Sequence, residues 1–342
     1  MRFGLTTKSV GGAANSAEFV KTDSWSVGRG RAVVLFVLGT PRSGTSALTR
    51  VLNLCGGTLP AGMCGADAGN PRGYWEPREA IVLNETILRR HGSHWCDPTL
   101  RLQEEDAVNG KDKAAHIAKI VAYLTSLPAA PLVLIKEPRI TLLSDLWFEA
   151  ARLAAFDVAA VIAVRHPQEV ISSMATWRVS PTLGSALWLK NNLLAERHTR
   201  GMRRVFIDYA NLVDDWQREM RRISAALAIE LNTANDDEIE GFLSPNLRRQ
   251  RYCGPVTDLF GTDWVSVAYK ALCAAASDEP VDGCALDRVF EQYRAGERDF
   301  RQAFDDSRDV SESMLSRFLR PSIAKPMMEL AAIAHRRKGT WA

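Results

Sequence analysis

The sequence lacks any apolar run long enough to cross a lipid bilayer. Its longest apolar stretch, Leu153 to Val164, is interrupted by Asp157 and is far shorter than the ~20 residues that a membrane-spanning helix needs. The first thirty residues carry basic side chains but no apolar segment of the kind found in secretory signals. We therefore expect a cytoplasmic protein without a transmembrane segment.

Cysteines are also few, and the net charge is small. The 342 residues include 6 cysteines, none of them in a C-x-x-C pair, which is typical of reduced, buried thiols and indicates neither a disulfide framework nor a metal site. The 43 Lys and Arg residues nearly balance the 40 Asp and Glu residues, for a net charge of +3. We therefore expect no nucleic-acid partner, and any anion-binding site must be local.

The remaining composition is that of a folded globular protein. Hydrophobic residues make up 46% of the chain and charged residues 24%, which are ordinary globular proportions. Residues 1–30 are rich in small and polar side chains without sustained periodicity, so they are predicted to be a flexible N-terminal tail. Residues 31–342 are predicted to form a single α/β domain.

Short apolar runs alternate with helical patterns along most of the chain. The runs, each of strand length, are Ala32–Leu38, Leu132–Ile135, Val158–Val164 and Val205–Ile207. The segments between them have apolar residues at helical spacing, as in 45–54, 79–90, 113–127, 142–155, 168–177, 183–200 and 212–227. This alternation predicts a parallel sheet flanked by helices, and a helical C-terminal region follows from about residue 257.

A small-residue loop follows the first predicted strand. Its sequence is Gly39-Thr-Pro-Arg-Ser-Gly-Thr-Ser46, and a helical pattern begins at its end. The backbone N–H groups of such a turn and the positive end of the helix dipole together favour an anion. Gly39 and Gly44 permit close approach of a ligand, Arg42 supplies a charge, and hydroxyl groups come from Ser43, Thr45 and Ser46.

Two readings of this loop compete. Its glycines have the spacing of G-x-x-x-x-G-K-[ST], but Thr45 stands where that motif has lysine. This substitution weakens the interpretation as an ATP or GTP phosphotransferase. A turn that binds nothing is the other alternative. We favour phosphate binding because the strand, the loop chemistry and the helix start agree.

The loop resembles the 5′-phosphosulfate loop of sulfotransferases that use PAPS (3′-phosphoadenosine 5′-phosphosulfate). That family has Lys or Arg at the place of Arg42, followed by Ser-Gly-Thr. It also holds the 3′-phosphate with an arginine at a strand end and a serine eight positions later, and Arg165 and Ser173 have this spacing. The resemblance covers roughly Val33 to Leu212. It implies a P-loop-type sheet, PAPS as the donor, PAP as the product and no required metal.

Two further segments resemble the family less closely. The strand Val205–Ile207 leads into Asp-Tyr-Ala-Asn-Leu212, similar to the family's Tyr-Glu-Asp-Leu, so Tyr209 either lies near the nucleotide or only caps the sheet. The basic cluster at 247–251 stands where many members have a loop that closes over the 3′-phosphate. Arg248 and Arg249 are therefore predicted nucleotide contacts, with a solvated basic face as the alternative.

Sulfuryl transfer to an alcohol needs a cation at the transferring group and a base for the hydroxyl. Lys136 ends the second predicted strand and so projects at the same sheet edge as Arg42, where open α/β sheets bind ligands. Glu76 is the preferred base. It lies in a loop whose aromatic side chains, Tyr74 and Trp75, are predicted to line an acceptor pocket. The alternative for Glu76 is a carboxylate that only stabilises a helix N-terminus.

Two other groups compete for the role of base. Glu137 is adjacent to Lys136, but strand alternation turns neighbouring side chains to opposite faces. His94 is the third candidate. Cytosolic small-molecule sulfotransferases have a histidine beside the strand-end lysine, and its absence here favours a glutamate base.

We therefore expect PAPS-dependent transfer to a hydroxyl, on a sugar or glycoconjugate, while small-molecule and peptide-tyrosine acceptors stay open. The C-terminal helices are expected to cover the α/β core or the acceptor cleft. A P-loop kinase and a non-catalytic nucleotide-binding protein with an idle Glu76 are the alternatives. The sequence leaves the oligomeric state open.

Overall fold

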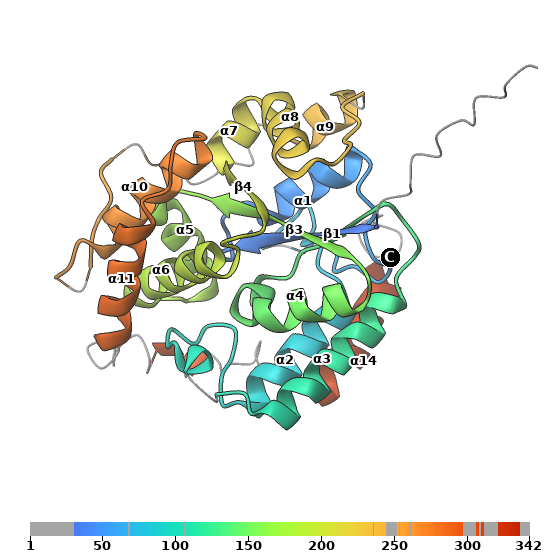
Figure 1. The fold of residues 1–342 in the computed structure, drawn as a ribbon, viewed down its shortest axis with the longest axis horizontal. Helices are drawn as coiled ribbons and strands as arrows, with labels where there is room; N and C mark the ends of the chain where they lie inside the picture. The colour runs from blue at the N-terminus through green and yellow to red at the C-terminus, as the bar shows by residue number, and fades with distance from the viewer. Residues whose placement is uncertain are drawn as a thin grey trace, which may run out of the picture. The chain divides into compact units, whose positions relative to one another are not determined.

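A parallel sheet with strand order β2-β1-β3-β4 forms the centre of the fold (Figure 1). The strands are β1 (Val33–Gly39), β2 (Leu132–Ile135), β3 (Asp157–Val164) and β4 (Arg203–Asp208). All three strand pairings are parallel, with Phe36 beside Ile135 and Val37 beside Val161. The predicted α/β class is thus confirmed, and each of the four strands lies where an apolar run predicted it.

The computed structural model describes residues 31–67, 69–104, 107–234, 236–243, 252, 254–259, 261–296, 306–307, 309–310 and 321–335. Residues 31–342 form one compact unit. The predicted N-terminal tail, 1–30, lies outside the described residues.

Helices follow the strands in the predicted order. They are α1 (Thr45–Leu54), α2 (Arg78–Arg90), α3 (Gly110–Thr125), α4 (Ser144–Leu153), α5 (Pro167–Met174), α6 (Pro181–His198), α7 (Tyr209–Asp214), α8 (Trp216–Leu227), α9 (Asp236–Phe242), α10 (Trp264–Ala276), α11 (Gly283–Ala295) and α14 (Pro321–His335). Short 3₁₀ turns occur at η1 (Arg101–Gln103), η2 (Pro138–Leu143) and η3 (Ala175–Trp177).

One predicted helix is two helices in the structure. The pattern over 212–227 is divided at Asp215, whose backbone leaves the helical conformation (φ −150°) and whose side chain accepts a hydrogen bond from the Arg218 N–H. Asp208 caps the preceding helix in the same way, through the Ala210 N–H. Aspartate at these positions satisfies N–H groups that lack partners within a helix, so two short helices form in place of one.

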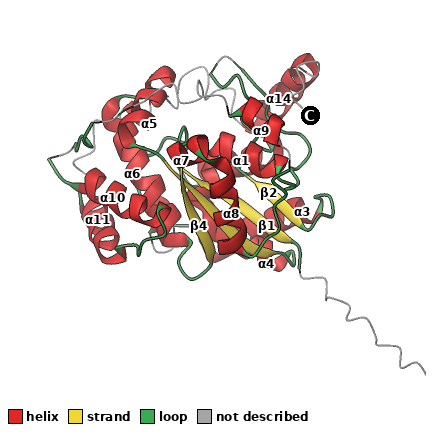
Figure 2. Ribbon diagram, turned by 90° about the horizontal axis from the view of Figure 1, so that it is seen from above, coloured by secondary structure: helices red, strands yellow, loops and turns green. Residues whose placement is uncertain are grey.

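The sheet separates two hydrophobic cores because side chains alternate along each strand. Leu35 and Val37 of β1 pack with α1 and α8 on one face. Phe36 and Leu38 belong to the larger core on the other face, which includes α4, α6, α10 and α11. Figure 2 shows the sheet between these helical layers. The C-terminal helices pack in different places: α10 packs on α6, α11 and β4, whereas α14 packs on α2.

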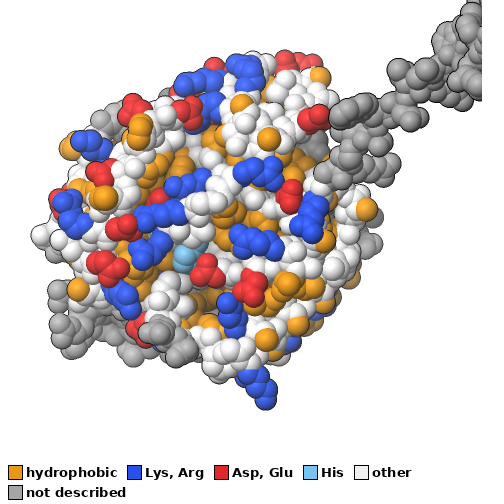
Figure 3. All heavy atoms as spheres, in the orientation of Figure 1, with side chains coloured by type: hydrophobic (Ala, Val, Ile, Leu, Met, Phe, Trp, Pro, Cys, Tyr) orange, Lys and Arg blue, Asp and Glu red, His pale blue; other side chains and the backbone are white. Residues whose placement is uncertain are grey.

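The surface carries charges of both signs. Figure 3 shows Lys and Arg side chains interspersed with Asp and Glu side chains over one face, in keeping with the net charge of +3. Within the described part of the chain, every helix is too short or too polar to cross a membrane.

Candidate active site

The phosphate loop joins β1 to α1 with a backbone that requires glycine at two positions. Gly39 and Gly44 have φ values of +131° and +93°, which residues with a side chain rarely adopt. A Cβ atom at Gly39 would lie 2.8 Å from the Ala163 carbonyl oxygen, and one at Gly44 would lie 2.2 Å from the Tyr209 ring. The two glycines therefore let the loop pack directly against β3 and against Tyr209.

Several groups of this loop suit an anion. Helix α1 begins without a capping side chain and without an acidic residue in its first turn, so its first N–H groups point toward the cavity with the positive end of the dipole. The Ser43 hydroxyl is buried and has no hydrogen-bond partner among the residues described. Leaving this hydroxyl unpaired is costly, but Ser43 is not among the residues that line the cavity. Gly44, Thr45 and Ser46 do line it, so the start of α1 is the part of the loop that fits a phosphate group.

Arg42 and Ser173 are directly bonded in the structure. The Arg42 Nε donates to the Ser173 Oγ over 2.8 Å, and the Arg42 guanidinium lies 4.8 Å from the centre of the Trp177 ring. Sequence reasoning assigned Arg42 to the 5′ loop and Ser173 to the 3′-phosphate. In the structure α5 brings Ser173 into hydrogen-bond contact with Arg42 of the phosphate loop, and these two roles stay predictions.

Arg165 lies immediately after β3 and belongs to the same cluster. Its guanidinium donates to the Arg42 carbonyl oxygen over 3.1 Å and to the Glu169 carboxylate over 2.8 Å. It also lies over the Tyr209 ring at 4.5 Å. The Tyr209 ring therefore packs against both Gly44 and Arg165.

Lys136 and Glu76 form an ion pair beside the phosphate loop. The Lys136 Nζ is bonded to the Glu76 carboxylate, and it also donates to the Tyr74 carbonyl oxygen at 3.1 Å and to the Ser46 Oγ at 3.3 Å. Glu76 is held by the pairing of its segment with residues 62–65, in which the Cys64 N–H donates to the Glu76 carbonyl oxygen. The lysine thus links the strand end, the phosphate loop and the carboxylate.

A second set of charges adjoins Lys136, and one of its members, Arg139, also lines the cavity. The Glu137 carboxylate is buried and is bonded to Arg139 and Asn84, and Arg139 is bonded in turn to Glu85. Burial raises the pKa of Glu137, although the Arg139 charge opposes this. Lys136 bonds to Glu76 and Ser46, whereas Glu137 bonds to Asn84 and Arg139. This network fixes the turn after β2 that carries Lys136.

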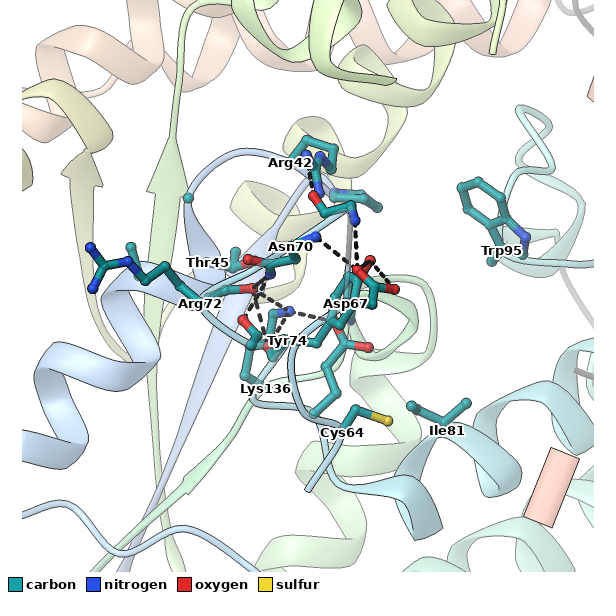
Figure 4. Close-up of a pocket in the computed structure, with 18 of the residues that line it drawn as sticks. Arg42, Thr45, Cys64, Asp67, Asn70, Arg72, Tyr74, Ile81, Trp95 and Lys136 are labelled. Atoms are coloured by element: carbon teal, nitrogen blue, oxygen red, sulfur yellow. Dashed lines mark hydrogen bonds and ion pairs between the residues drawn. The ribbon is translucent and has the colours of Figure 1, made fainter. Parts of the chain in front are cut away.

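These residues surround a cavity of about 710 Å³ (Figure 4). The predicted site residues that line it are Arg42, Gly44, Thr45, Ser46, Glu76, Lys136, Arg165, Ser173 and Tyr209. Ser43 is buried beneath the loop. Arg248 and Arg249 lie outside the described residues.

Two predicted neighbours of the site are elsewhere. Tyr74 lines the cavity but Trp75 does not; the Trp75 ring instead lies under the Arg50 guanidinium of α1, at 4.8 Å. The third candidate base, His94, is not among the lining residues and is hydrogen-bonded to Ser307 at 3.2 Å. Burial lowers its pKa. Its ring is partly buried and contacts Cys96 and Ser307.

Sequence reasoning missed part of the cavity wall. Asp67, Asn70, Trp95, Trp177 and Asn191 line it, together with α14. Asn70 begins the loop that was singled out around Glu76, so proximity in sequence was a usable signal there. Trp95 had no such signal, because only the fold brings it to the carboxyl ends of the strands. For α14, the expectation that C-terminal helices cover the core or the acceptor cleft gave the region but not the residues that line the cavity.

Comparison with known proteins identifies the family. The model of the sulfotransferase family matches residues 35–233, whereas no curated protein sequence matches the chain. Similar solved structures include the sulfotransferase domain of the Synechococcus PCC 7002 olefin synthase, with 21% identity over 77% of this chain and 95% of that chain and a TM-score of 0.37.

A second is the sulfotransferase domain from the curacin biosynthetic pathway, with 17% identity over 76% of this chain and 97% of that chain and a TM-score of 0.37. A third is mouse sulfotransferase SULT7A1 complexed with PAP, with 16% identity over 75% of this chain and 88% of that chain and a TM-score of 0.36. The family match spans all of the sheet except the first two residues of β1, and it includes the phosphate loop, the Arg165 and Ser173 cluster and the Lys136–Glu76 pair. The chain therefore belongs to the sulfotransferase family.

Proposed function

We propose that this protein transfers a sulfuryl group from PAPS to a hydroxyl group of an acceptor. One observation carries the proposal: the phosphate loop, the Arg42, Arg165 and Ser173 cluster, and the Lys136–Glu76 pair border a single cavity. They lie at the carboxyl ends of β1, β3 and β2, where open parallel sheets bind ligands.

The residues present suit a donor with two phosphate positions. The uncapped start of α1 and the hydroxyl groups of Thr45 and Ser46 offer donors at one position, and Arg165 and Ser173 offer donors at the other. Arg42 lies between them and can serve either. PAPS, when bound, supplies an activated sulfuryl group whose departure leaves negative charge on a phosphate. Guanidinium groups suit such charge because they bind phosphate oxygens in pairs.

The Lys136–Glu76 pair supplies the remaining chemistry in this proposal. Glu76 accepts the proton of the acceptor hydroxyl, and the Lys136 ammonium stabilises the charge that develops near the phosphate loop. Lys136 already reaches Ser46 as well as Glu76, so a small movement shifts it from one to the other. Glu137 is less suited to this role because Arg139 and Asn84 occupy its oxygens.

The test combines binding with turnover. PAP should raise the melting temperature without added metal, since a ligand at a hundredfold excess over its Kd stabilises the native state by about 2.7 kcal/mol. Labelled sulfate should pass from PAPS to a hydroxyl acceptor. A larger stabilisation by ATP with Mg²⁺ would favour the kinase alternative, and PAP binding without transfer to any acceptor in a broad panel would favour the non-catalytic one.

A further inference from the structure

The cavity changes character beyond the Lys136–Glu76 pair. Helix α14 contributes only apolar side chains to the cavity lining, and one thiol and one aliphatic side chain from other segments complete this part of the wall. The residues concerned are Ala324, Met327, Met328 and Ala331 of α14, with Ile81 of α2 and Cys64. Because these side chains come from three segments, the apolar lining is a property of the folded cavity and not of one helix.

The apolar wall begins directly beside the reactive pair. The Cys64 sulfur lies 3.9 Å from the Met328 sulfur and points toward Ile81 (Figure 4). Burial, reinforced by the nearby Glu76 carboxylate, raises the pKa of the Cys64 thiol to about 12. An acceptor whose hydroxyl reached Glu76 would therefore place the rest of its body against these groups.

Charged groups of α14 stay at its outer edges. Glu329 pairs with Arg78, and Lys325 pairs with Glu79. The Glu329, Lys325 and Glu79 side chains are each about half exposed or more. These pairs attach α14 to α2 from the solvent side, so the helix presents its apolar side chains to the cavity.

Two polar residues of the cavity wall, Asp67 and Asn70, bond mainly to groups of their own loop, residues 67–74. The Asp67 carboxylate accepts hydrogen bonds from the Gly69 and Asn70 N–H groups and from the Tyr74 hydroxyl. The Asn70 amide donates to the Gly73 carbonyl oxygen at 2.8 Å. A sugar would require hydrogen bonds to several hydroxyls in place of these, and polar groups buried without partners are costly.

We propose that the acceptor hydroxyl is attached to an apolar body, an alkyl or aryl chain, and that Met327 and Met328 determine this specificity. This inference rests on the proposed sulfotransferase function. Methionine is flexible and fills irregular gaps, so it can adapt to acceptors of different shape. The sugar or glycoconjugate predicted from the sequence is the competing acceptor class, and the experiment compares the two directly.

The experiment measures acceptor binding and turnover on the full chain saturated with PAP or PAPS. The acceptors are primary alcohols from 1-butanol to 1-octanol, with methyl glucoside as the sugar. Each added methylene should raise affinity and kcat/KM about twofold to fourfold, as expected for transfer of CH₂ out of water. Methyl glucoside should bind more weakly than 1-octanol. Affinity independent of chain length, or tighter binding of the glucoside, overturns the inference.

Substitutions locate the effect on α14. Met327→Gln and Met328→Gln keep the side-chain length but add a polar amide, so each should lower kcat/KM for 1-octanol about tenfold, and by more than for 1-butanol, while PAP binding changes little. Leu330→Gln is the matched control, because Leu330 is 65% exposed on the same helix and is not among the lining residues. Equal losses in all three variants overturn the assignment to Met327 and Met328. Failure of PAP to bind while the alcohols still bind by chain length contradicts the proposed function alone.

Discussion

The ammonium group of Lys136 and the carboxylate of Glu76 form an ion pair whose side chains are only 3% and 12% exposed. A buried pair of this kind is sensitive to the loss of either partner, because the remaining charge has no water to solvate it. The same two groups border the cavity next to the phosphate loop. Their contributions to stability and to turnover can therefore be separated by substitution.

Glu76→Gln should abolish the base while preserving the shape of the side chain and an acceptor for Lys136. Loss of a positioned base lowers turnover by ~10²- to 10⁴-fold, so we expect a decrease of that size with nearly unchanged PAP affinity, measured by steady-state sulfate transfer and calorimetry. Glu79→Gln is the control, since Glu79 is half exposed on the next turn. Retention of most activity in Glu76→Gln would exclude Glu76 as the base.

Lys136→Met should destabilise the fold because it leaves the Glu76 carboxylate buried and unpaired. Breaking a buried pair in this way costs about 3–5 kcal/mol, which urea unfolding can measure. The double variant Lys136→Met, Glu76→Gln should recover much of this stability, because no charge is then left behind, but it should not recover turnover. If the double variant is as unstable as Lys136→Met, the destabilisation comes from packing and not from the unpaired carboxylate.

Arg165→Ala should weaken PAP binding more than AMP binding, because AMP lacks the 3′-phosphate. Hydrogen bonds to a charged group contribute about 1.5–3 kcal/mol, so we expect a tenfold to hundredfold loss for PAP and a small change for AMP, measured by calorimetry. Arg197→Ala, which removes a surface pair with Asp287, should change neither. An unchanged ratio of the two affinities would show that Arg165 does not bind the 3′-phosphate.

Gly44→Ala should disrupt the phosphate loop through its contact with Tyr209. Both Gly44 and Gly56 have positive φ values, but only at Gly44 would a Cβ collide with another residue; the space around Gly56 is open. Gly56→Ala should therefore cost only the backbone strain of about 1–2 kcal/mol. Gly44→Ala should cost more in thermal unfolding and should also weaken PAP binding. Equal effects of the two substitutions would contradict the role given to Tyr209.

Stability should fall as the pH decreases through the ordinary range of histidine. Burial holds the pKa of His94 below its usual value of 6.5, so the unfolded chain takes up the proton first as the pH falls, and the free energy of unfolding decreases from about pH 6.5 down to the folded-state pKa. His94→Gln should flatten this decrease between pH 7.5 and 5.5 in urea unfolding. The destabilisation that the substitution causes by itself is measured at pH 7.5. If the free energy of unfolding falls with pH as steeply in His94→Gln as in the parent, His94 is not the group responsible.

The parts of the fold that follow from local sequence were predictable. Apolar runs located the four strands, and the strand ends placed Arg42, Lys136 and Arg165 at one edge of the sheet, because parallel strands share their direction. The split at Asp215 was missed because the apolar periodicity continues across it. A helix pattern records which face is buried, but a single capping side chain decides where the helix is interrupted.

The side-chain partners within the site were less predictable. Spacing identified Arg165 and Ser173, yet it could not show that Arg42 donates to Ser173, because that contact depends on how α5 packs above the loop. Trp75 is an aromatic residue of the kind that lines pockets. Its backbone has a positive φ of +56°, however, which turns the chain there, and its ring lies against Arg50. Side-chain direction at such a turn is set by the fold and not by the pattern.

The helix that forms the apolar end of the cavity, α14, lies outside residues 35–233, the part of the chain that matches the family. Of the apolar residues named above, Cys64 and Ile81 lie within the matched stretch, whereas the four residues of α14 lie outside it. Substitutions in residues 321–335 can therefore reshape the apolar end without altering a group of the phosphate loop. If the proposed function holds, exchange of this one helix is a direct route to variants that accept another substrate from the same donor.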